Sequence, residues 1–213
     1  MLTLSNVSLT LNNEYLIKDF SAEISAGKVL AVMGPSGVGK SSLLAYVSGT
    51  LAPEIQGSGS VTLDHTELTQ VATEQRRLGL LQQAPLLFPH LSVMENVLFA
   101  IPREVSKSLR REQAKAALAS VGLEQHENKL PEQLSGGQQA RLALIRTLSA
   151  KPQALLLDEP FSKLDKALRQ DMRELVMKAV CTHQIPAILV THDEDDARAM
   201  AFQTCYLSGA SNT

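Results

Sequence analysis

The chain has 213 residues, of which 44% are hydrophobic and 20% are charged, values that are ordinary for a soluble globular protein. The length suits one large α/β domain, or one domain with a small helical insertion. Twenty basic and 22 acidic residues give a formal net charge of −2, which argues against nucleic acid as a partner, since a phosphate backbone favours a basic surface.

The chain lacks the sequence features of a membrane-spanning or secreted protein. No apolar run approaches the roughly 18–20 residues that span a bilayer, and residues 1–6 have neither the basic nor the apolar region of a secretory signal. Cys181 and Cys205 have no metal-ligand spacing, so we expect two buried thiols in a reducing cytosol. These features predict a cytoplasmic protein.

The N-terminal part of the chain has the pattern of antiparallel strands. Apolar residues alternate at positions 2 and 4, change phase at Asn6, and alternate again at positions 7, 9 and 11. A second alternating run covers residues 20–24, and a short strand is expected at residues 61–63 after a glycine-rich turn at residues 57–59. Alternation of this kind is typical of strands with one solvated face.

Deeper strands are predicted where apolar residues run on without alternation, at residues 29–33, 154–157 and 187–190. Such runs suit a parallel sheet that is covered on both faces. A last strand is expected at residues 204–207.

Between these strands, residues 108–121 predict an amphipathic helix with Leu109, Ala117, Leu118 and Val121 on its apolar side. This helix lies within residues 92–134, which interrupt the alternation of strands and helices and read as a helical insertion. The fold class expected is therefore α/β, with a mostly parallel sheet, an N-terminal antiparallel β part and an α-helical insertion.

Residues 34–41 read Gly-Pro-Ser-Gly-Val-Gly-Lys-Ser and fill every fixed position of the phosphate loop of P-loop NTPases. Glycines let consecutive backbone N–H groups approach a triphosphate, and the loop is expected to open a helix whose N-terminal dipole favours an anion. Lys40 is expected to reach the β- and γ-phosphates, and the Ser41 hydroxyl to bind Mg²⁺. The predicted ATP-binding residues here are Gly34, Pro35, Ser36, Gly37, Val38, Gly39, Lys40, Ser41 and Ser42.

Two adjacent carboxylates follow the apolar run at residues 154–157. The carboxyl end of a parallel strand delivers its last side chains to the ligand crevice. We expect Asp158 to hold Mg²⁺ and Glu159 to accept a proton from the water that attacks the γ-phosphate. The alternative is an ordinary solvated strand end.

A second glycine-containing helix start is predicted at Leu-Ser-Gly-Gly-Gln, residues 134–138. Ser135 is a good N-cap for a helix expected at residues 138–148, and Gly136 and Gly137 let backbone amides approach an anion. An ordinary capped helix start would also explain the pattern. One nucleotide, however, does not need two anion-binding helix starts.

The arrangement of these motifs resembles that of the nucleotide-binding subunits of ATP-binding cassette (ABC) transporters, over nearly the whole chain. The resemblance implies one ABC ATPase domain at residues 1–213, with a P-loop NTPase core of the RecA-like type and a helical subdomain inserted at about residues 92–148. It also implies a homodimer in which each ATP lies between one phosphate loop and the partner's signature residues. These residues are Ser135, Gly136, Gly137 and Gln138.

The resemblance assigns further roles on the nucleotide side. Tyr15 stands where the family stacks an aromatic ring on adenine, with Phe20 as the competing candidate. Gln83 aligns with the glutamine that touches Mg²⁺ and the attacking water, although Gln82 leaves a register one residue earlier open. His192 aligns with the histidine that contacts the γ-phosphate.

The loop after Glu159 resembles the segment that crosses the dimer interface in this family. Asp165 retains the family's residue type there, whereas Lys163 replaces a small residue. Residues 84–91 form an apolar loop that either contacts a membrane partner or anchors the helical arm to the core.

The function implied is that of the ATP-hydrolysing subunit of a bacterial importer at the cytoplasmic face of the inner membrane. Its implied partners are integral membrane permease subunits and a periplasmic or lipid-anchored solute-binding protein, with no nucleic acid. The resemblance is to bacterial cassettes that serve the uptake of thiamine, iron, molybdate, sulfate or polyamines. Many of these carry a C-terminal regulatory domain, for which the end of the chain at Thr213 is expected to leave no room, and this favours the thiamine-type end of the group. A soluble, non-transport ABC ATPase is the alternative; a P-loop kinase or GTPase would not explain residues 134–138.

Overall fold

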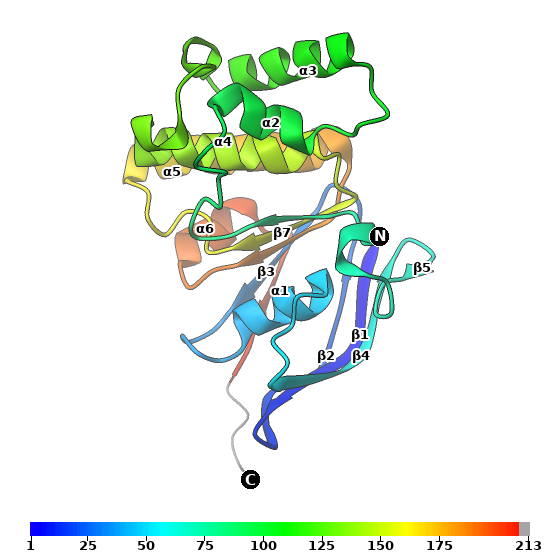
Figure 1. The fold of residues 1–213 in the computed structure, drawn as a ribbon. Helices are drawn as coiled ribbons and strands as arrows, with labels where there is room; N and C mark the ends of the chain where they lie inside the picture. The colour runs from blue at the N-terminus through cyan, green and yellow to red at the C-terminus, as the bar shows by residue number, and fades with distance from the viewer. Residues whose placement is uncertain (209–213) are drawn as a thin grey trace. The chain divides into compact units, whose positions relative to one another are not determined.

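The computed structural model describes residues 1–208 of the chain. These residues divide into two compact units (Figure 1). The first comprises Met1–Leu80, Gln153–Glu159 and the chain from Met177 onward, and the second comprises Leu81–Pro152 and Pro160–Val176. Within residues 1–208, no helix has both the length and the apolar character needed to cross a membrane.

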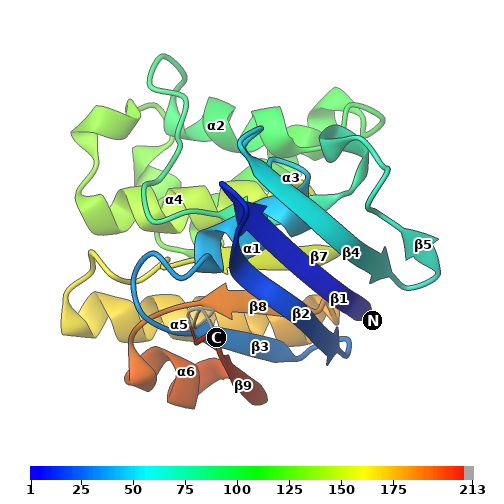
Figure 2. The same ribbon diagram turned by 90° about the horizontal axis from the view of Figure 1, so that it is seen from below.

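An antiparallel sheet opens the first unit. It contains β1 (Leu2–Leu11), β2 (Glu14–Ile24), β4 (Ile55–Leu63) and the short β5 (Thr66–Glu67), in the order β2-β1-β4-β5, and Figure 2 shows β2, β1 and β4 side by side. The change of phase expected at Asn6 is confirmed: the register between β1 and β2 shifts between Leu4 and Val7, and Asn6 has φ 51°. This bulge keeps the apolar side chains on both sides of it in the core.

The prediction of a turn at residues 57–59 is wrong, because these residues lie inside β4; Gly57 and Ser58 pair with β1, and Gly59 lies at the register shift between the two strands. The glycines serve close packing instead. A Cβ atom on Gly57 would come within 2.5 Å of the Tyr46 ring, and one on Gly59 would come within 2.5 Å of the Asn6 carbonyl oxygen at the bulge. Tyr46 also donates a hydrogen bond to the Gly59 carbonyl at 2.8 Å.

The second sheet has the order β6-β7-β8-β3-β9. Its strands are β6 (Leu78–Leu81), β7 (Ala154–Asp158), β8 (Ala187–Val190), β3 (Val29–Met33) and β9 (Gln203–Tyr206). The pairs β7–β8, β8–β3 and β3–β9 are parallel, so the three predicted apolar strands are confirmed, and the last strand begins one residue earlier than expected. The four-residue β6 was not expected, since so short a run carries too little pattern.

Both faces of β3 are covered, which explains its continuous apolar run. Leu30 and Val32 belong to the main core of the first unit, together with side chains of α1 (Lys40–Ser48) and of the antiparallel sheet. Ala31 and Met33 pack on the other face against Ala197 of α6 (Glu194–Met200). A strand placed in this way fixes the loop that follows it.

The second unit is helical. It contains α2 (Val93–Ala100), α3 (Lys107–Ser120), α4 (Gly136–Ser149), the first part of α5 (Lys166–His183) and the single turns η2 (Glu124–His126) and η3 (Pro131–Gln133); the turn η1 (Thr73–Gln75) belongs to the first unit. Its core includes the fully buried Val97, Leu118, Leu123 and Leu142.

The helix expected at residues 108–121 is confirmed as α3, with one correction. Leu109 is 45% exposed, whereas Ala114 and Leu118 are fully buried. Leu109 lies about 140° around the helix from Ala114, outside the narrow stripe that faces the core.

The expectation of two buried thiols is wrong for Cys181, which is exposed near the end of α5. Cys205 on β9 is half-buried. Its burial raises the pKa of the thiol, so it is the less reactive of the two.

The end of α1 is held by a buried arginine. Arg76, which is 6% exposed, donates through Nη1 to the carbonyls of Tyr46 and Val47 at 3.0 and 2.8 Å, where a helix end lacks some of its intrahelical donors. The Tyr46 carbonyl also accepts from the Gly49 N–H group at 3.2 Å. The guanidinium lies against Gly49, where a Cβ atom would come within 2.7 Å of Arg76 Cζ and where φ is +79°. Two reasons therefore favour glycine at position 49: a side chain would collide with Arg76, and the backbone is left-handed.

Gly49→Ala should therefore lower the free energy of unfolding by about 3 kcal/mol, because it adds the displacement of Arg76 to the cost of a left-handed alanine. Gly122→Ala is the matched control, since Gly122 also has positive φ (+68°) but its Cβ would meet nothing within 4 Å; its expected loss is about 1 kcal/mol. Urea unfolding of the two variants measures the difference. Equal losses would contradict the role given to Arg76.

Candidate functional site

The phosphate loop joins β3 to α1, as its sequence predicts. Gly37 and Gly39 have φ of +82° and +100°, a region that side chains other than glycine rarely adopt. Gly39 is the N-cap of α1, and no side chain caps the helix there. The first backbone N–H groups of α1 therefore stay available to an anion.

Lys40 is folded back over this loop. Its ammonium group donates to the carbonyl oxygens of Gly34 and Pro35, both at 2.8 Å, and the residue is only 5% exposed. An ammonium has three N–H donors, so these two bonds hold Lys40 against the loop and leave a third proton to donate.

Ser41 and Asp158 bring two oxygen atoms together at the carboxyl end of β7. The Ser41 hydroxyl donates to Asp158 Oδ1 at 3.0 Å. Burial raises the pKa of Asp158, and the neighbouring charge of Glu159 adds to this, while the Ser41 hydrogen bond and the charge of Lys40 oppose it. A hydroxyl and a carboxylate at this spacing fit Mg²⁺, which prefers hard oxygen ligands.

Glu159 and His192 form the second contact at this edge of the sheet. His192 Nδ1 lies 3.1 Å from Glu159 Oε1, and the two side chains are 57% and 23% exposed, respectively. The backbone of Glu159 has φ 45°, while its N–H group donates to the Val190 carbonyl of β8. A non-glycine residue in the left-handed region is uncommon and is often found at functional sites.

The segment of β2 that carries Tyr15 lies next to the phosphate loop. A Cβ atom on Gly39 would come within 3.2 Å of Leu16 Cβ, so the Tyr15 segment of β2 passes directly against the loop. The Tyr15 side chain is 47% exposed, with the Lys18 ammonium 5.4 Å from its ring centroid. The competing candidate, Phe20, is half-buried against the core of the first unit.

In the second unit, the helix expected to begin at residue 138 begins at Gly136 instead, directly after its N-cap Ser135. Ser135 and Gln138 form a capping box: Gln138 N donates to Ser135 Oγ at 3.3 Å, and Ser135 N donates to Gln138 Oε1 at 3.0 Å. A Cβ atom on Gly137 would collide with the Leu168 side chain, whereas one on Gly136 would meet nothing within 4 Å. Gly137 thus serves packing, and Gly136 faces open space.

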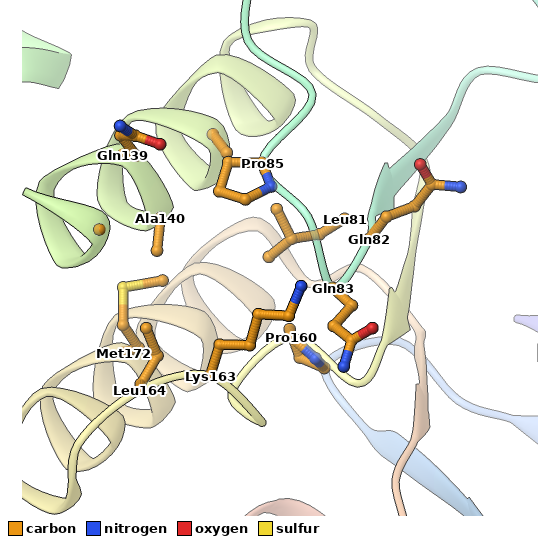
Figure 3. Close-up of a pocket in the computed structure, with 12 residues that line it drawn as sticks. Leu81, Gln82, Gln83, Pro85, Gln139, Ala140, Pro160, Lys163, Leu164 and Met172 are labelled. Carbon is orange, nitrogen blue, oxygen red and sulfur yellow. The ribbon is translucent and has the colours of Figure 1, made fainter. Parts of the chain in front are cut away.

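Gln83 and Lys163 border a cavity of about 230 Å³ within the second unit, with mostly apolar walls that include Leu81, Leu164 and Met172. In Figure 3 the Lys163 side chain extends along this cavity toward Gln83, and Gln82 points away from it. The Gln83 amide donates to Ser162 Oγ at 3.0 Å.

Asp165 accepts a hydrogen bond from the Leu168 backbone N–H group at 3.0 Å. This bond satisfies an amide at the start of α5.

Asn96 is a residue that the sequence analysis missed. It is fully buried in α2, where Oδ1 accepts from the Phe88 N–H group at 2.9 Å and Nδ2 donates to the carbonyls of Phe88, Leu91 and Ser92 at 3.0–3.1 Å. These bonds fix the chain before α2. The sequence contained one signal of this role: Asn96 is an amide side chain among the apolar residues of a short helix, and a buried amide needs hydrogen-bond partners.

Residues 84–91 anchor the chain to the second unit and also carry an exposed apolar side chain. Leu87 packs against the core of the second unit, whereas Leu86 is 63% exposed. The Phe88 ring lies 4.6 Å from the ring of Phe99, which is 63% exposed, and the Arg146 guanidinium lies 5.3 Å from the Phe88 centroid. Anchoring and exposed apolar side chains thus occur in the same segment.

Comparison with known proteins agrees with these features. The family model described as "ABC transporter" matches residues 17–162. The chain is 42% identical over 199 residues to the uncharacterized ABC transporter ATP-binding protein YnjD of Escherichia coli K12 (93% of this chain, 92% of the relative). It is 40% identical over 208 residues to the thiamine import ATP-binding protein ThiQ of Vibrio vulnificus (97% and 87%).

Among solved structures, the chain is similar to the ATP-binding cassette MJ0796 in a dimeric, post-hydrolysis state bound to ADP and Pi. The TM-score is 0.82, the sequence identity is 31%, and the match covers 98% of this chain and 95% of the other.

Replacing Asp158 by Asn should stabilise the nucleotide-free protein at pH 7, because a half-buried carboxylate whose folded pKa is raised costs folding free energy once it is ionised. The penalty grows as pH rises from the unfolded pKa of about 4 through the raised folded pKa, so both proteins should be equally stable near pH 3. We expect the Tm to rise by about 1–3 °C at pH 7, measured by calorimetry.

The exposed Glu54 provides the control for this experiment. Glu54→Gln should leave the Tm unchanged at both pH values. A lower Tm for Asp158→Asn at pH 7 would show that the Ser41 hydrogen bond outweighs the desolvation of the carboxylate.

Proposed function

We propose that the chain, which belongs to the ABC transporter family as an ATP-binding and ATP-hydrolysing subunit, works as an importer subunit, and that two copies of it drive solute uptake through a separate membrane permease. The relatives include the thiamine subunit ThiQ of Vibrio vulnificus and the ergothioneine subunit EgtV of Helicobacter pylori. In this proposal the two units form one ATPase domain, with a helical subdomain at about residues 92–148.

The observation that carries the proposal is the presence of two helix starts suited to an anion. The first begins at Lys40 after the uncapped Gly39, and the second begins at Gly136, whose Cα faces open space. Since the chain has one copy of each, a head-to-tail pair of chains would give two ATP sites, each with both helix starts. The dimeric cassette bound to ADP and Pi supports this arrangement.

On the phosphate-loop side, Lys40 and the first amides of α1 would bind the phosphates of ATP. Ser41 and Asp158 would hold Mg²⁺, which when bound neutralises phosphate charge. Glu159 would accept a proton from the attacking water. A proton on His192 Nδ1 would be donated to the Glu159 carboxylate at 3.1 Å and would thereby orient it.

The remaining predicted residues fit the same proposal. Tyr15 would stack on adenine, since its ring is exposed and it precedes Leu16, which lies against Gly39 of the loop. Gln83 would touch the metal and the attacking water, and Asp165 would organise the loop that crosses the interface. Residues 135–138 would contact the partner's ATP through the open side of Gly136.

The exposed apolar side chains of Leu86 and Phe99 would form the contact with the permease. They flank Phe88, whose backbone is held by Asn96, so the contact would be attached to α2. We place the protein at the cytoplasmic face of the inner membrane through this contact, with a periplasmic or lipid-anchored solute-binding protein as the further component.

The first test is size-exclusion chromatography of Glu159→Gln with and without Mg-ATP. The variant should bind ATP, lose turnover and shift from monomer to dimer, because Gln keeps the shape of Glu but cannot accept the proton from water. Lys40→Ala should show no shift, since it loses ATP binding itself. A Glu159→Gln variant that stays monomeric in saturating ATP would contradict the paired arrangement.

The permease contact is tested by replacing Phe99 with Ser in the cells that naturally produce this chain, and by isolating it together with its membrane fraction. Co-purification should fall about tenfold, as expected for the loss of a large apolar anchor at an interface, while ATP binding by the isolated protein stays unchanged. Leu109→Ser is the matched control, because Leu109 is another exposed apolar side chain of the second unit.

The same experiment separates transport from the alternative of a soluble ABC ATPase that acts on a macromolecular complex. A transporter subunit should co-purify with a multi-spanning membrane protein. If the wild-type chain brings down no membrane protein and instead associates with a soluble complex, the alternative holds.

A further inference from the structure

The side chain of Gln138, the last residue of the signature motif, lies between two partners of the second unit. Its Oε1 atom accepts a hydrogen bond from the Ser135 backbone N–H group at 3.0 Å, and its Nε2 atom lies 3.1 Å from Nε2 of His126. Nothing in the motif itself points to His126, which comes from η2, twelve residues earlier.

The hydrogen-bond pattern determines the protonation of this histidine. Because Oε1 of Gln138 accepts from a backbone N–H group, the group that faces His126 is the amide NH₂, which can only donate. His126 Nε2 must therefore accept, and the neutral ring carries its proton on Nδ1. This tautomer follows from the hydrogen-bond network.

The backbone of His126 is held at both ends. Its N–H group donates to the carbonyl of the fully buried Leu123 at 2.9 Å, and its carbonyl accepts from the Lys129 N–H group at 3.0 Å. The next residues join this turn to the start of α2, since Met94 N donates to the Glu127 carbonyl at 2.9 Å and Val93 N to the Lys129 carbonyl at 2.8 Å. The ring is thus presented to Gln138 from a rigid support.

Stability alone does not account for the imidazole. Nδ1 of His126 is buried and has no hydrogen-bond partner within residues 1–208, and a buried N–H group without a partner is unfavourable. A leucine of similar size would fill the same space without that cost. What leucine cannot provide is the acceptor for the Gln138 amide.

We propose that His126 is a positioning residue for the signature motif. It holds the Gln138 amide so that Oε1 stays bonded to the Ser135 N–H group. The other half of the capping box, from Gln138 N to Ser135 Oγ, is long at 3.3 Å. The Ser135 hydroxyl can therefore turn to a phosphate oxygen while the His126–Gln138–Ser135 chain keeps the helix start in place.

The proposal rests on the proposed function, because the position of residues 135–138 affects turnover only if they meet ATP held by a second copy. His126 would also connect the start of α2 to the start of α4. α2 carries Phe99 and Asn96, and its first N–H groups bond to the turn that presents His126. A displacement at the start of α2 would be transmitted to the signature helix through this ring.

The test uses His126→Leu and His126→Gln in the Glu159→Gln background. Leu removes the acceptor, whereas the Oε1 atom of Gln can replace imidazole Nε2. For His126→Leu, we expect the ATP concentration that gives half-maximal dimer to rise about fivefold, the size of a lost N-cap interaction, and His126→Gln should restore it to within about twofold. Binding of a fluorescent ATP analogue to the monomer should not change, because the phosphate loop is intact.

A second readout does not depend on dimerisation. Hydrogen exchange of the Ser135 amide, followed by NMR in the monomer, should become several-fold faster in His126→Leu and return in His126→Gln, because this amide donates to Gln138. His65→Leu, at an exposed histidine of the first unit, should change neither readout.

The outcomes separate the two proposals. Unchanged Ser135 exchange in His126→Leu, or a His126→Gln variant as defective as His126→Leu, overturns the positioning role. If the Glu159→Gln parent does not dimerise in ATP, the proposed function fails, and the exchange measurement still decides whether His126 positions Gln138.

Discussion

The start of α1 offers its first backbone amides to an anion because no side chain caps them, and much of the first unit follows from this constraint. Gly39 begins α1 without a cap, in a left-handed conformation that only glycine adopts at low cost. An uncapped helix start is unfavourable by itself. It is maintained because β3 is buried on both faces and Arg76 satisfies the other end of α1.

A second feature of the site is a pair of like charges, which the carboxyl end of β7 places close to the phosphate loop. Asp158 is the last residue of β7 and Glu159 follows it directly, and burial already raises the pKa of Asp158. Glu159 also has a left-handed backbone. Such local costs are typical of functional sites, where the surrounding structure holds groups that would otherwise move apart. The neighbouring Lys40, Ser41 and His192 limit this cost in the absence of ligand.

The helical unit solves a different problem, because the start of α4 is capped by Ser135 and Gln138 and must still leave space for a ligand in front of Gly136. Gly137 lets α4 approach Leu168, while Gly136 leaves space in front of the helix. Asn96 and His126 are polar groups placed inside this unit, each with a defined set of hydrogen bonds. For Asn96, whose amide oxygen and nitrogen are both bonded, such bonds give the packed region one preferred arrangement, since an alternative would leave a donor or an acceptor unsatisfied.

The sequence by itself determined the features whose physics is local. The phosphate loop, the three apolar strands and the bulge at Asn6 depend on neighbouring residues, and the structure has them where the pattern predicts. Tertiary structure decided the rest. Residues 57–59 read as a turn but form a strand, because Tyr46 and the Asn6 bulge need glycine opposite them. Likewise, no local pattern pairs His126 with Gln138 or Asn96 with Phe88, since a hydrogen bond between side chains and loops distant along the chain exists only after packing has placed its donor and its acceptor together.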